Sequence, residues 1–146
     1  MPATDRSEND PLRLADDLAI RNLTARLAHL ADESGAEDLD EYISLFTNDA
    51  SWGPPGREHK GRGEILQGAR ERRLNGQQGP GTDTRHIVTT QAIRFEGLDA
   101  AVSDAYFVIM AQTKTHPTIR LVGAYHDLLR REDGVWRLAS RQITLG

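Results

Sequence analysis

Asp32 and His86 lie far apart in the sequence, and their side chains suit acid–base chemistry if the fold brings them together. Asp32 falls in the last turn of a predicted helix, where an exposed carboxylate opposes the helix dipole at a cost of roughly 0.3–1 kcal/mol. We therefore expect a compensating partner. A buried imidazole is suitable, because it donates one ring N–H to the carboxylate and keeps its other nitrogen free as a base. His86, at the start of a predicted strand, is our candidate, and the simpler alternative is a solvated carboxylate and a structural histidine.

A phenol is the third candidate group. Tyr125 and His126 are neighbours in a predicted strand, so only one of the two side chains can face a cavity. Tyr125 is expected to share its face with Leu121, Gly123 and Asp127. We prefer it as the pocket phenol and proton donor, with a bound water as another possible donor. The alternative is a core tyrosine with a satisfied hydroxyl.

The other histidines do not form a metal-binding pattern. His29 is expected on the surface of the first helix, and His59 and His116 in exposed turns. No two histidines have the spacing His-x-His or His-Glu-x-x-His, so the sequence predicts no built-in metal site and no cofactor. The chain has no cysteine, which excludes disulfides, thiolate catalysis and thiolate-bound zinc.

The bulk composition bounds the size and the partners of the protein. A length of 146 residues fits one domain, and we expect residues 1–10 to be a mobile leader and residues 11–146 to form the domain. The net charge of −4 gives no attraction for nucleic acid. No apolar run is long enough to span a bilayer, and the N-terminus lacks the pattern of an export signal, so the sequence predicts a cytoplasmic protein without membrane contact.

Three helices are predicted in the first half of the chain. Asp10 followed by Pro11 is a start signal for the first helix, which should end near residue 35. Its apolar residues recur at spacings of three and four: Ile20, Leu23, Leu27 and Leu30. Further helices fit residues 39–46 and 63–75, with a short strand expected at residues 50–52.

The third predicted helix has an apolar and a basic side. Its inward-facing residues are expected to be Ile65, Leu66, Ala69 and Leu74. Arg70, Arg72 and Arg73 are expected on a solvated face. The glycine-rich segment 76–81 leads from a helix to a strand, unlike a phosphate-binding loop, and we interpret it as a flexible flap near the mouth of a pocket.

After this segment the hydrophobic period switches to two, which indicates strands. Four extended segments are predicted, at residues 84–95, 100–112, 118–130 and 135–145. Strict alternation would place one face of the first strand, His86, Val88, Thr90 and Ala92, opposite Ile87 and Ile93. Because helices come first and strands follow, the sequence predicts an α+β fold: a cone-like α+β barrel with N-terminal helices packed in a curved, mostly antiparallel sheet. Such a sheet leaves a cavity suited to a small molecule.

A succession of short segments runs in order through most of the chain. The segments are residues 19–23, Arg26, Asp32, 40–42, 45–50, Gly61, 84–86, 123–127 and 130–138. In this order and spacing they resemble the SnoaL-like family of the nuclear-transport-factor-2-like superfamily, over about residues 16–143. The resemblance implies a cone-like α+β barrel and frequent homo-oligomers, here a dimer or a trimer.

The members of that family differ in activity. They include scytalone dehydratase, a dehydrochlorinase, ketosteroid isomerase, polyketide cyclases and proteins without catalysis, so function does not follow from the fold. In the dehydratase and dehydrochlorinase members an Asp ends the first helix and a His begins a following strand, which matches Asp32 and His86 here. Dehydratase-like members often carry a Tyr five residues before that Asp, and this chain has Leu27 there, so a donor must come from elsewhere.

These observations predict a cofactor-independent lyase of the dehydratase type, or an isomerase, that acts on a small, largely apolar, cyclic or polyketide-like molecule. Asp32 and His86 would form the acid/base pair and Tyr125 the donor. The pocket is expected to be lined by Leu27, Ala28, Trp52, Val88 and Leu121. The alternative is a non-catalytic small-molecule-binding protein or an accessory subunit of the same fold.

Overall fold

The computed structural model of the protein describes residues 10–146, so the predicted leader, except for Asp10, lies outside the described residues. The helices are α1 (Pro11–Glu33), α2 (Asp40–Ser44) and α3 (Gly61–Leu74), and the strands are β1 (Phe46–Gly53), β2 (His59–Lys60), β3 (Arg85–Phe95), β4 (Ala100–Ala111), β5 (Thr118–Glu132) and β6 (Val135–Leu145). None of the helices in this part of the chain combines the length and the apolarity needed to cross a membrane.

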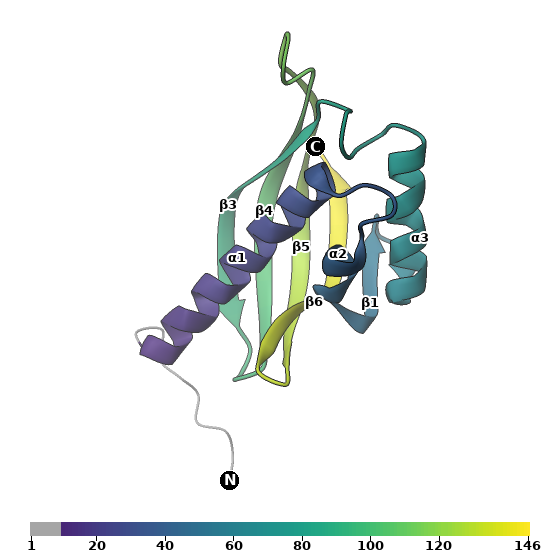
Figure 1. Ribbon diagram of the computed structural model, residues 1–146. Coiled ribbons are helices and arrows are strands. Elements are labelled where there is room, and N and C mark those ends of the chain that lie inside the picture. Colours follow the sequence, from purple (N-terminus) through teal and green to yellow (C-terminus); the bar gives the residue numbers. More distant parts are fainter. Residues whose placement is uncertain (1–9) are drawn as a thin grey trace.

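One six-stranded sheet forms the body of the molecule, with the strand order β2-β1-β6-β5-β4-β3. Neighbouring strands are antiparallel except β1 and β6, which run parallel. The sheet curves, and α1 lies diagonally across it (Figure 1). The predicted α+β fold with a curved, mostly antiparallel sheet is confirmed. The sheet stays open, with β2 and β3 as its edges.

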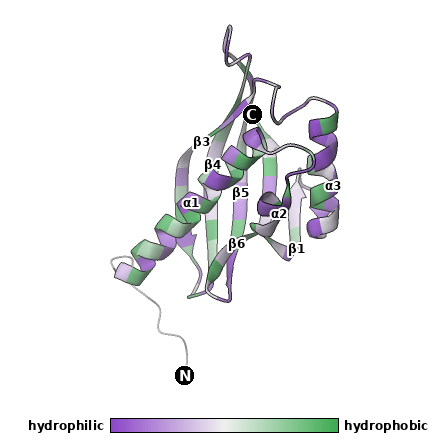
Figure 2. Ribbon diagram, viewed as in Figure 1, coloured by the Kyte–Doolittle hydropathy of each residue, from purple (hydrophilic) through white to green (hydrophobic). Residues whose placement is uncertain are grey.

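The first helix forms as predicted. The Asp10 side chain accepts a hydrogen bond from the Leu12 backbone N–H at 2.8 Å, and Pro11 occupies the first turn. Apolar and polar residues alternate around the helix (Figure 2). Its predicted inward-facing residues are at most 7% exposed: Ile20, Leu23, Leu27 and Leu30. The helix ends at Glu33 beside the first residues of β3, which brings Asp32 to His86.

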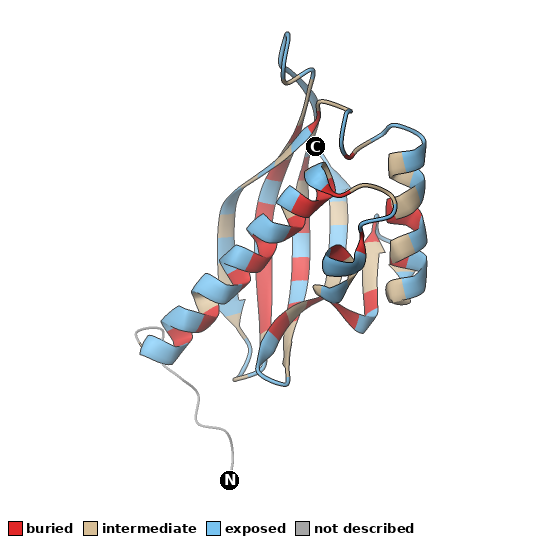
Figure 3. Cartoon of the chain, viewed as in Figure 1, coloured by how far each residue is buried: buried red, intermediate tan, exposed pale blue. Residues whose placement is uncertain are grey.

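The core fills the space between the helices and the concave side of the sheet. Its largest cluster joins the inward residues of α1 to Phe46, Ile65 and Trp136. A smaller cluster is formed by Phe107, Ile109 and Tyr125 on β4 and β5. Buried residues accordingly recur along the strands that α1 crosses (Figure 3).

Between residues 39 and 60 the structure differs from the prediction. α2 is a short helix that ends at Ser44, and Phe46 begins β1 instead of ending the helix. The backbone here pairs with β6, Phe46 opposite Leu138, so tertiary pairing overrides a locally helical pattern. His59, expected in an exposed turn, lies in the short strand β2 opposite Trp52 and is only partly exposed.

The face assignment along β3 was wrong beyond Thr89. A β-bulge shifts the register between Thr89 and Ala92, and Thr90 has a φ of 53°. The extra residue reverses the alternation, so Ile93 packs against the core and Ala92 is exposed. Only His86 and Val88 of the predicted face point inward.

The third helix presents Ile65 and Ala69 to the core as predicted. Leu74, expected to face inward, is 70% exposed because it is the last residue of the helix. All three arginines expected in solvent are partly buried: Arg70 donates to the Ala36 carbonyl, and Arg72 and Arg73 lie against neighbouring elements. These two arginines turn out to be part of the site described next.

Candidate active site

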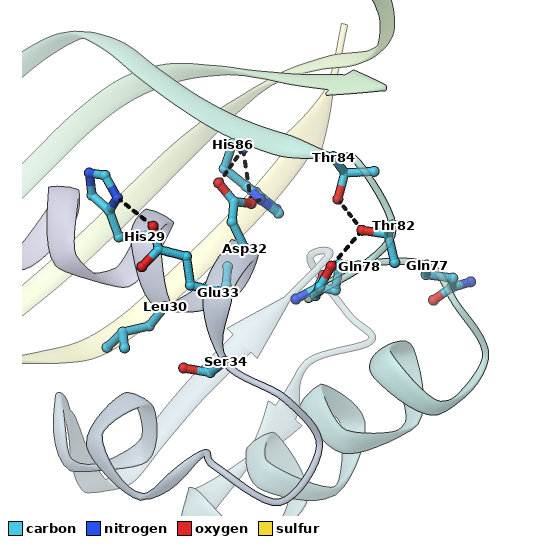
Figure 4. Close-up of polar contacts among 12 residues, drawn as sticks. His29, Leu30, Asp32, Glu33, Ser34, Gln77, Gln78, Thr82, Thr84 and His86 are labelled. Atoms are coloured by element: carbon cyan, nitrogen blue, oxygen red, sulfur yellow. Dashed lines mark hydrogen bonds and ion pairs between the residues drawn. The ribbon is translucent and has the colours of Figure 1, made fainter. Parts of the chain in front are cut away.

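Asp32 and His86 are in direct contact (Figure 4). The Asp32 Oδ1 atom lies 2.7 Å from His86 Nδ1, and the two side chains are 15% and 10% exposed. The backbone N–H of His86 also donates to both oxygens of Asp32, at 3.1 Å each. Because an ionised carboxylate only accepts hydrogen bonds, Nδ1 is the protonated ring nitrogen. The other nitrogen, Nε2, donates to or accepts from no residue within 10–146.

The C-terminal end of α1, where Asp32 opposes the helix dipole, is stabilised by Arg73 of α3. The guanidinium donates to the carbonyls of Leu30, Ala31 and Ser34, at 3.2, 3.2 and 2.6 Å. α1 has no basic residue in its own last turn. Arg73 therefore supplies the missing donors and a positive charge beside Asp32. This explains why it is not on a solvated face.

An inner cavity of about 30 Å³ lies between α1, α3 and the concave side of the sheet. Its lining is Leu27, Ala28, Ala31, Tyr42, Trp52, Arg72, Gln78, His86, Val88, Tyr125 and Arg141. This volume admits a group about the size of a water molecule. In this conformation the cavity therefore accepts one polar group of a ligand, and the remainder of the ligand must lie elsewhere.

Tyr125 places its phenol in the wall of this cavity. The Tyr125 ring is stacked on the Phe107 ring, with centroids 4.3 Å apart. The guanidinium carbon of Arg141 lies over the Tyr125 ring, 3.8 Å from its centroid. Burial raises the pKa of Tyr125 to about 12, although the nearby charge of Arg141 acts in the opposite direction. The phenol is therefore protonated at neutral pH and can donate a hydrogen bond.

An outer cavity of about 520 Å³ lies on the other side of His86. It is lined by the end of α1, the start of β3, and the loops around Gly79 and Lys114, and it includes Asp32. Ala28, His86 and Val88 line both cavities. The volume is in the range of small-molecule sites. The predicted flap, residues 76–81, contributes Gly79, Pro80 and Gly81 to this wall, as its predicted position requires, while its flexibility stays a prediction.

Two arginines of the inner cavity differ in their partners. Arg141 forms a buried bidentate pair with Asp127, at 2.9 and 2.8 Å. Burial lowers the pKa of Arg141, but the charge of Asp127 outweighs this and raises it above its ordinary value. Arg72 stacks over Trp52 at 4.3 Å and donates from Nε to Gln78 at 3.3 Å. Burial lowers its pKa.

Most of the predicted site residues come together. Asp32 and His86 touch, and the residues that line the inner cavity with His86 include Leu27, Ala28, Trp52, Val88 and Tyr125. Leu121 is the exception: it packs against the Phe107–Tyr125 cluster and lines neither of these two cavities. It lies on the inner face of β5 as predicted, packed against that cluster.

Four further residues line the inner cavity without a sequence pattern that predicts them there: Tyr42, Arg72, Gln78 and Arg141. Two of these are charged, Arg72 on α3 and Arg141 on β6, and a charged side chain is usually solvated. A signal for a basic partner was present, since α1 ends without a basic residue or a glycine cap. That signal points to Arg73 and not to Arg72.

The other histidines lie away from the pair. His29 and His126 are exposed and contact Glu33 and Asp104. His126 is on the opposite face of β5 from Tyr125, as predicted. His59 stacks near Trp52, with ring centroids 6.1 Å apart. Within residues 10–146 there is no group of three or more potential metal ligands.

A sequence-family comparison gives one match. The family described as "SnoaL-like domain" matches residues 12–142, most of the chain. No curated protein matches the sequence.

Several solved structures have the same fold. A protein of unknown function with a cystatin-like fold from Nostoc punctiforme is 23% identical, with a TM-score of 0.76 over 90% of this chain and 92% of that one. A candidate scytalone dehydratase from Novosphingobium aromaticivorans is 20% identical, with a TM-score of 0.74 over 91% and 85%. A protein from Catenulispora acidiphila, solved in complex with S-DNPA, is 24% identical, with a TM-score of 0.75 over 90% and 94%. At these identities the likeness shows the fold.

Proposed function

Because the chain belongs to the SnoaL-like family, we propose that it is a cofactor-independent lyase of the dehydratase type, or an isomerase, that acts on a small, largely apolar, cyclic or polyketide-like molecule. The observation that supports this most strongly is the hydrogen bond between Asp32 and His86 Nδ1 beside two cavities. The bond orients the imidazole and leaves Nε2 available as a base.

The two cavities divide the substrate between them. The outer cavity has the volume for the body of a small molecule, and the inner cavity has room for one polar group. Asp32 lines only the outer cavity, while His86 lines both. Since the two ring nitrogens point in different directions, a ring whose Nδ1 faces Asp32 directs Nε2 away from that carboxylate. We propose that Nε2 meets the substrate at His86, where the two cavities adjoin.

The reaction that fits this arrangement is elimination of water from a β-hydroxy carbonyl compound. His86 Nε2 removes a proton from the carbon next to the carbonyl, and the C–H electron pair forms an enolate. The enolate then re-forms the carbonyl, makes the new C=C bond and expels hydroxide, which leaves as water after it receives a proton. Asp32 stabilises the imidazolium until it returns this proton to the group that protonated the hydroxide, which restores both groups. Such positioned acid–base help is typically worth about 10²–10⁴-fold in rate.

Tyr125 is the proposed donor to the departing hydroxide. Its phenol lines the inner cavity, and its raised pKa of about 12 keeps it protonated. A bound water is the alternative donor. If the enolate is reprotonated at another carbon instead of expelling a group, the same residues catalyse isomerisation.

One observation favours the alternative of a non-catalytic binding protein. The inner cavity of about 30 Å³ accepts little more than a single polar group, so a binding module could hold its ligand in the outer cavity alone. The two functions differ in turnover, because a binding module holds its ligand unchanged.

We also propose that the protein is a homo-oligomer, a dimer or a trimer. The outer face of the sheet carries exposed apolar side chains at Ile87, Tyr106 and Val122, which are 43%, 59% and 45% exposed. Val108 pairs with both Ile87 and Val122, which makes the patch continuous across three strands. A second subunit would remove this patch from water.

To test the activity, the protein is incubated with a panel of small cyclic β-hydroxy ketones. Dehydration is measured by the ultraviolet absorption of the conjugated product. We expect the wild-type protein to dehydrate at least one of them. His86→Ala and Asp32→Asn should each lower the rate by about 10²–10⁴-fold, and the double variant should lose little more than either single one.

The matched control is His126→Ala. His126 also contacts a carboxylate through Nδ1, at 2.6 Å from Asp104, but on the exposed face of β5. Its loss should leave the rate unchanged. A wild-type rate equal to that of His86→Ala, for every ketone tested, would favour the binding protein.

A further inference from the structure

Arg72 places a positive charge at the inner cavity, on the far side from α1. It lies two turns from Ile65 on α3 and lines the cavity together with His86 and Tyr125. Its guanidinium carbon stacks over Trp52 at 4.3 Å. An indole holds the plane of a guanidinium but leaves its edge free to donate hydrogen bonds.

The edge of this guanidinium lacks acceptors in the described part of the chain. Its single side-chain hydrogen bond there runs from Nε to Gln78 Oε1, at 3.3 Å. Nη1 and Nη2 donate to no residue within 10–146, and no carboxylate in that range lies within ion-pair distance. The neighbouring arginines differ, since Arg73 binds four carbonyls and Arg141 binds both oxygens of Asp127.

A partly buried guanidinium without an anion destabilises the protein that holds it, because burial removes water from the charge. Burial lowers the pKa of Arg72 for the same reason. A structural role would be met by a neutral side chain of similar size stacked on Trp52. The charge is therefore better explained by a ligand that brings the missing anion.

Gly68 lacks a side chain at the position where one would crowd this guanidinium. A Cβ atom at Gly68 would lie 3.2 Å from Arg72 Nη1 and 2.9 Å from His59 Nε2. A glycine inside a helix costs roughly 0.5–1 kcal/mol relative to alanine. The helix thus carries a locally unfavourable residue one turn before Arg72, where a side chain would press on the arginine.

We infer that Arg72 is a further catalytic residue, which binds the enolate or phenolate oxygen of an enolisable carbonyl substrate at the inner cavity. The inference rests on the proposed function. When His86 removes a proton from carbon, negative charge moves to the carbonyl oxygen, and this oxygen is the polar group that the inner cavity has room for. With the oxygen in that cavity, the departing hydroxide lies outside it and takes its proton from the alternative donor, a bound water. A guanidinium stabilises such an oxygen with short, charge-assisted hydrogen bonds.

The substrate class follows from this geometry. It is a carbonyl compound whose oxygen becomes anionic easily, such as a β-dicarbonyl or a hydroxyaryl ketone. The oxygen-bearing end enters the inner cavity toward Arg72, and the apolar body stays in the outer cavity beside Val88 and Pro80. The weak bond to Gln78 is the contact that Arg72 gives up as the oxygen enters.

The experiment compares the binding of two probes to the full-length protein by calorimetry: 4-nitrophenolate at mildly alkaline pH, and nitrobenzene, which is similar in shape but uncharged. We expect the wild-type protein to prefer 4-nitrophenolate. Arg72→Met should weaken its binding about tenfold or more and leave nitrobenzene binding nearly unchanged. Arg72→Lys should lie between, because it keeps the charge without the planar fork.

Arg70→Met is the matched control, since Arg70 lies on the same helix and donates to the Ala36 carbonyl outside the cavity. It should bind both probes as the wild type does. Gly68→Ala is a second variant that keeps Arg72. It should weaken 4-nitrophenolate binding without loss of helix, whereas Gly63→Ala, where a Cβ meets no atom within 4 Å, should have no effect.

Failure of this inference is distinct from failure of the proposed function. His86→Ala should lose turnover and still bind 4-nitrophenolate, because Arg72 remains. Three results would overturn the role of Arg72: unchanged 4-nitrophenolate binding in Arg72→Met, an equal loss for both probes, or no preference for the anion in the wild-type protein. None of these depends on whether a ketone is dehydrated.

Discussion

The Asp32 carboxylate accepts hydrogen bonds from two groups of His86, the backbone N–H and the imidazole ring. The backbone bonds fix where β3 begins, and the ring bond fixes how the imidazole is oriented. The same carboxylate therefore positions the strand and selects the tautomer of its first inward-facing side chain. Loss of Asp32 should disturb both.

The tautomer of His86 can be measured directly by nitrogen-15 NMR. We predict a neutral ring with the proton on Nδ1 and an unprotonated Nε2, because Asp32 accepts the Nδ1–H. In Asp32→Ala this preference should disappear. A wild-type ring with the proton on Nε2 would mean that His86 is not held as a base.

Tyr125 makes a pH-dependent contribution to stability. Its pKa is raised from 10.0 to about 12 by burial, so between those values the folded protein keeps a proton that the unfolded chain releases. The stabilisation is fully present below the unfolded pKa and is lost as the pH rises through the folded one. When the pH rises from about 9 to about 11, the free energy of unfolding should fall in both proteins. The fall should be about 1 kcal/mol smaller in Tyr125→Phe than in the wild type, because the variant lacks the phenol. Urea unfolding at both pH values checks this, and equal losses would contradict the burial of the phenol.

The pairing of Asp32 with His86 could be predicted at this scale because a carboxylate at a helix C-terminus needs compensation, and because the surrounding segments resemble a family. Arg72 could not. Its sequence neighbours are charged, and only the position of α3 beside Trp52 turns it toward the cavity. Which way a long side chain points is decided by tertiary packing.

At the scale of elements, α1 and α3 are joined through Arg73. Because it donates to three carbonyls at the end of α1, we predict that Arg73→Met lowers the free energy of unfolding by about 1–3 kcal/mol. Arg70→Met, which removes one bond to the Ala36 carbonyl, should cost less. Urea denaturation compares the two, and equal midpoints would show that Arg73 does not stabilise the helix end.

Strands β4, β5 and β6 approach one another closely at Gly123. A Cβ there would lie 2.4 Å from the Thr144 carbonyl oxygen and 2.5 Å from a ring carbon of Phe107. Gly123→Ala should therefore destabilise the protein by about 1–3 kcal/mol and shift Phe107 under Tyr125. Gly35→Ala, where a Cβ meets nothing within 4 Å, is the control for thermal unfolding. A melting temperature of Gly123→Ala equal to that of the wild type would contradict the close approach.

The boundaries of most elements could be predicted, because capping and hydrophobic period are local properties. The bulge at Thr90 could not. It follows from the way β3 pairs with β4, and one extra residue was enough to move Ile93 to the core. Phe46 shows the same limit, since it begins a strand that pairs with β6, which is distant in the sequence.

At the scale of the whole molecule, the fold follows from the segregation of helices and strands along the chain. Helices cover the concave side of the sheet, and on the other side apolar side chains are exposed at Ile87, Tyr106 and Val122. Assembly through that face and a cytoplasmic location stay predictions, because both depend on partners and surroundings outside one chain.

Assembly can be tested by light scattering after size-exclusion chromatography. We predict a dimer or a trimer for the wild-type protein and a smaller mass for Val122→Lys, because a charge in the patch must lose its water on association. Leu74→Lys changes an apolar residue that is 70% exposed on α3, and it should not alter the mass. A monomeric wild-type protein would contradict the proposal.

The central claim is that His86, held by Asp32, removes a proton from carbon. Proton NMR in heavy water measures this step alone, as deuterium uptake at the carbon next to the carbonyl of each ketone in the panel. We predict uptake with the wild-type protein and with His126→Ala, and a rate at least about 100-fold lower with His86→Ala. Uptake that is equal with and without the His86 imidazole, or no uptake with any ketone, would contradict the claim.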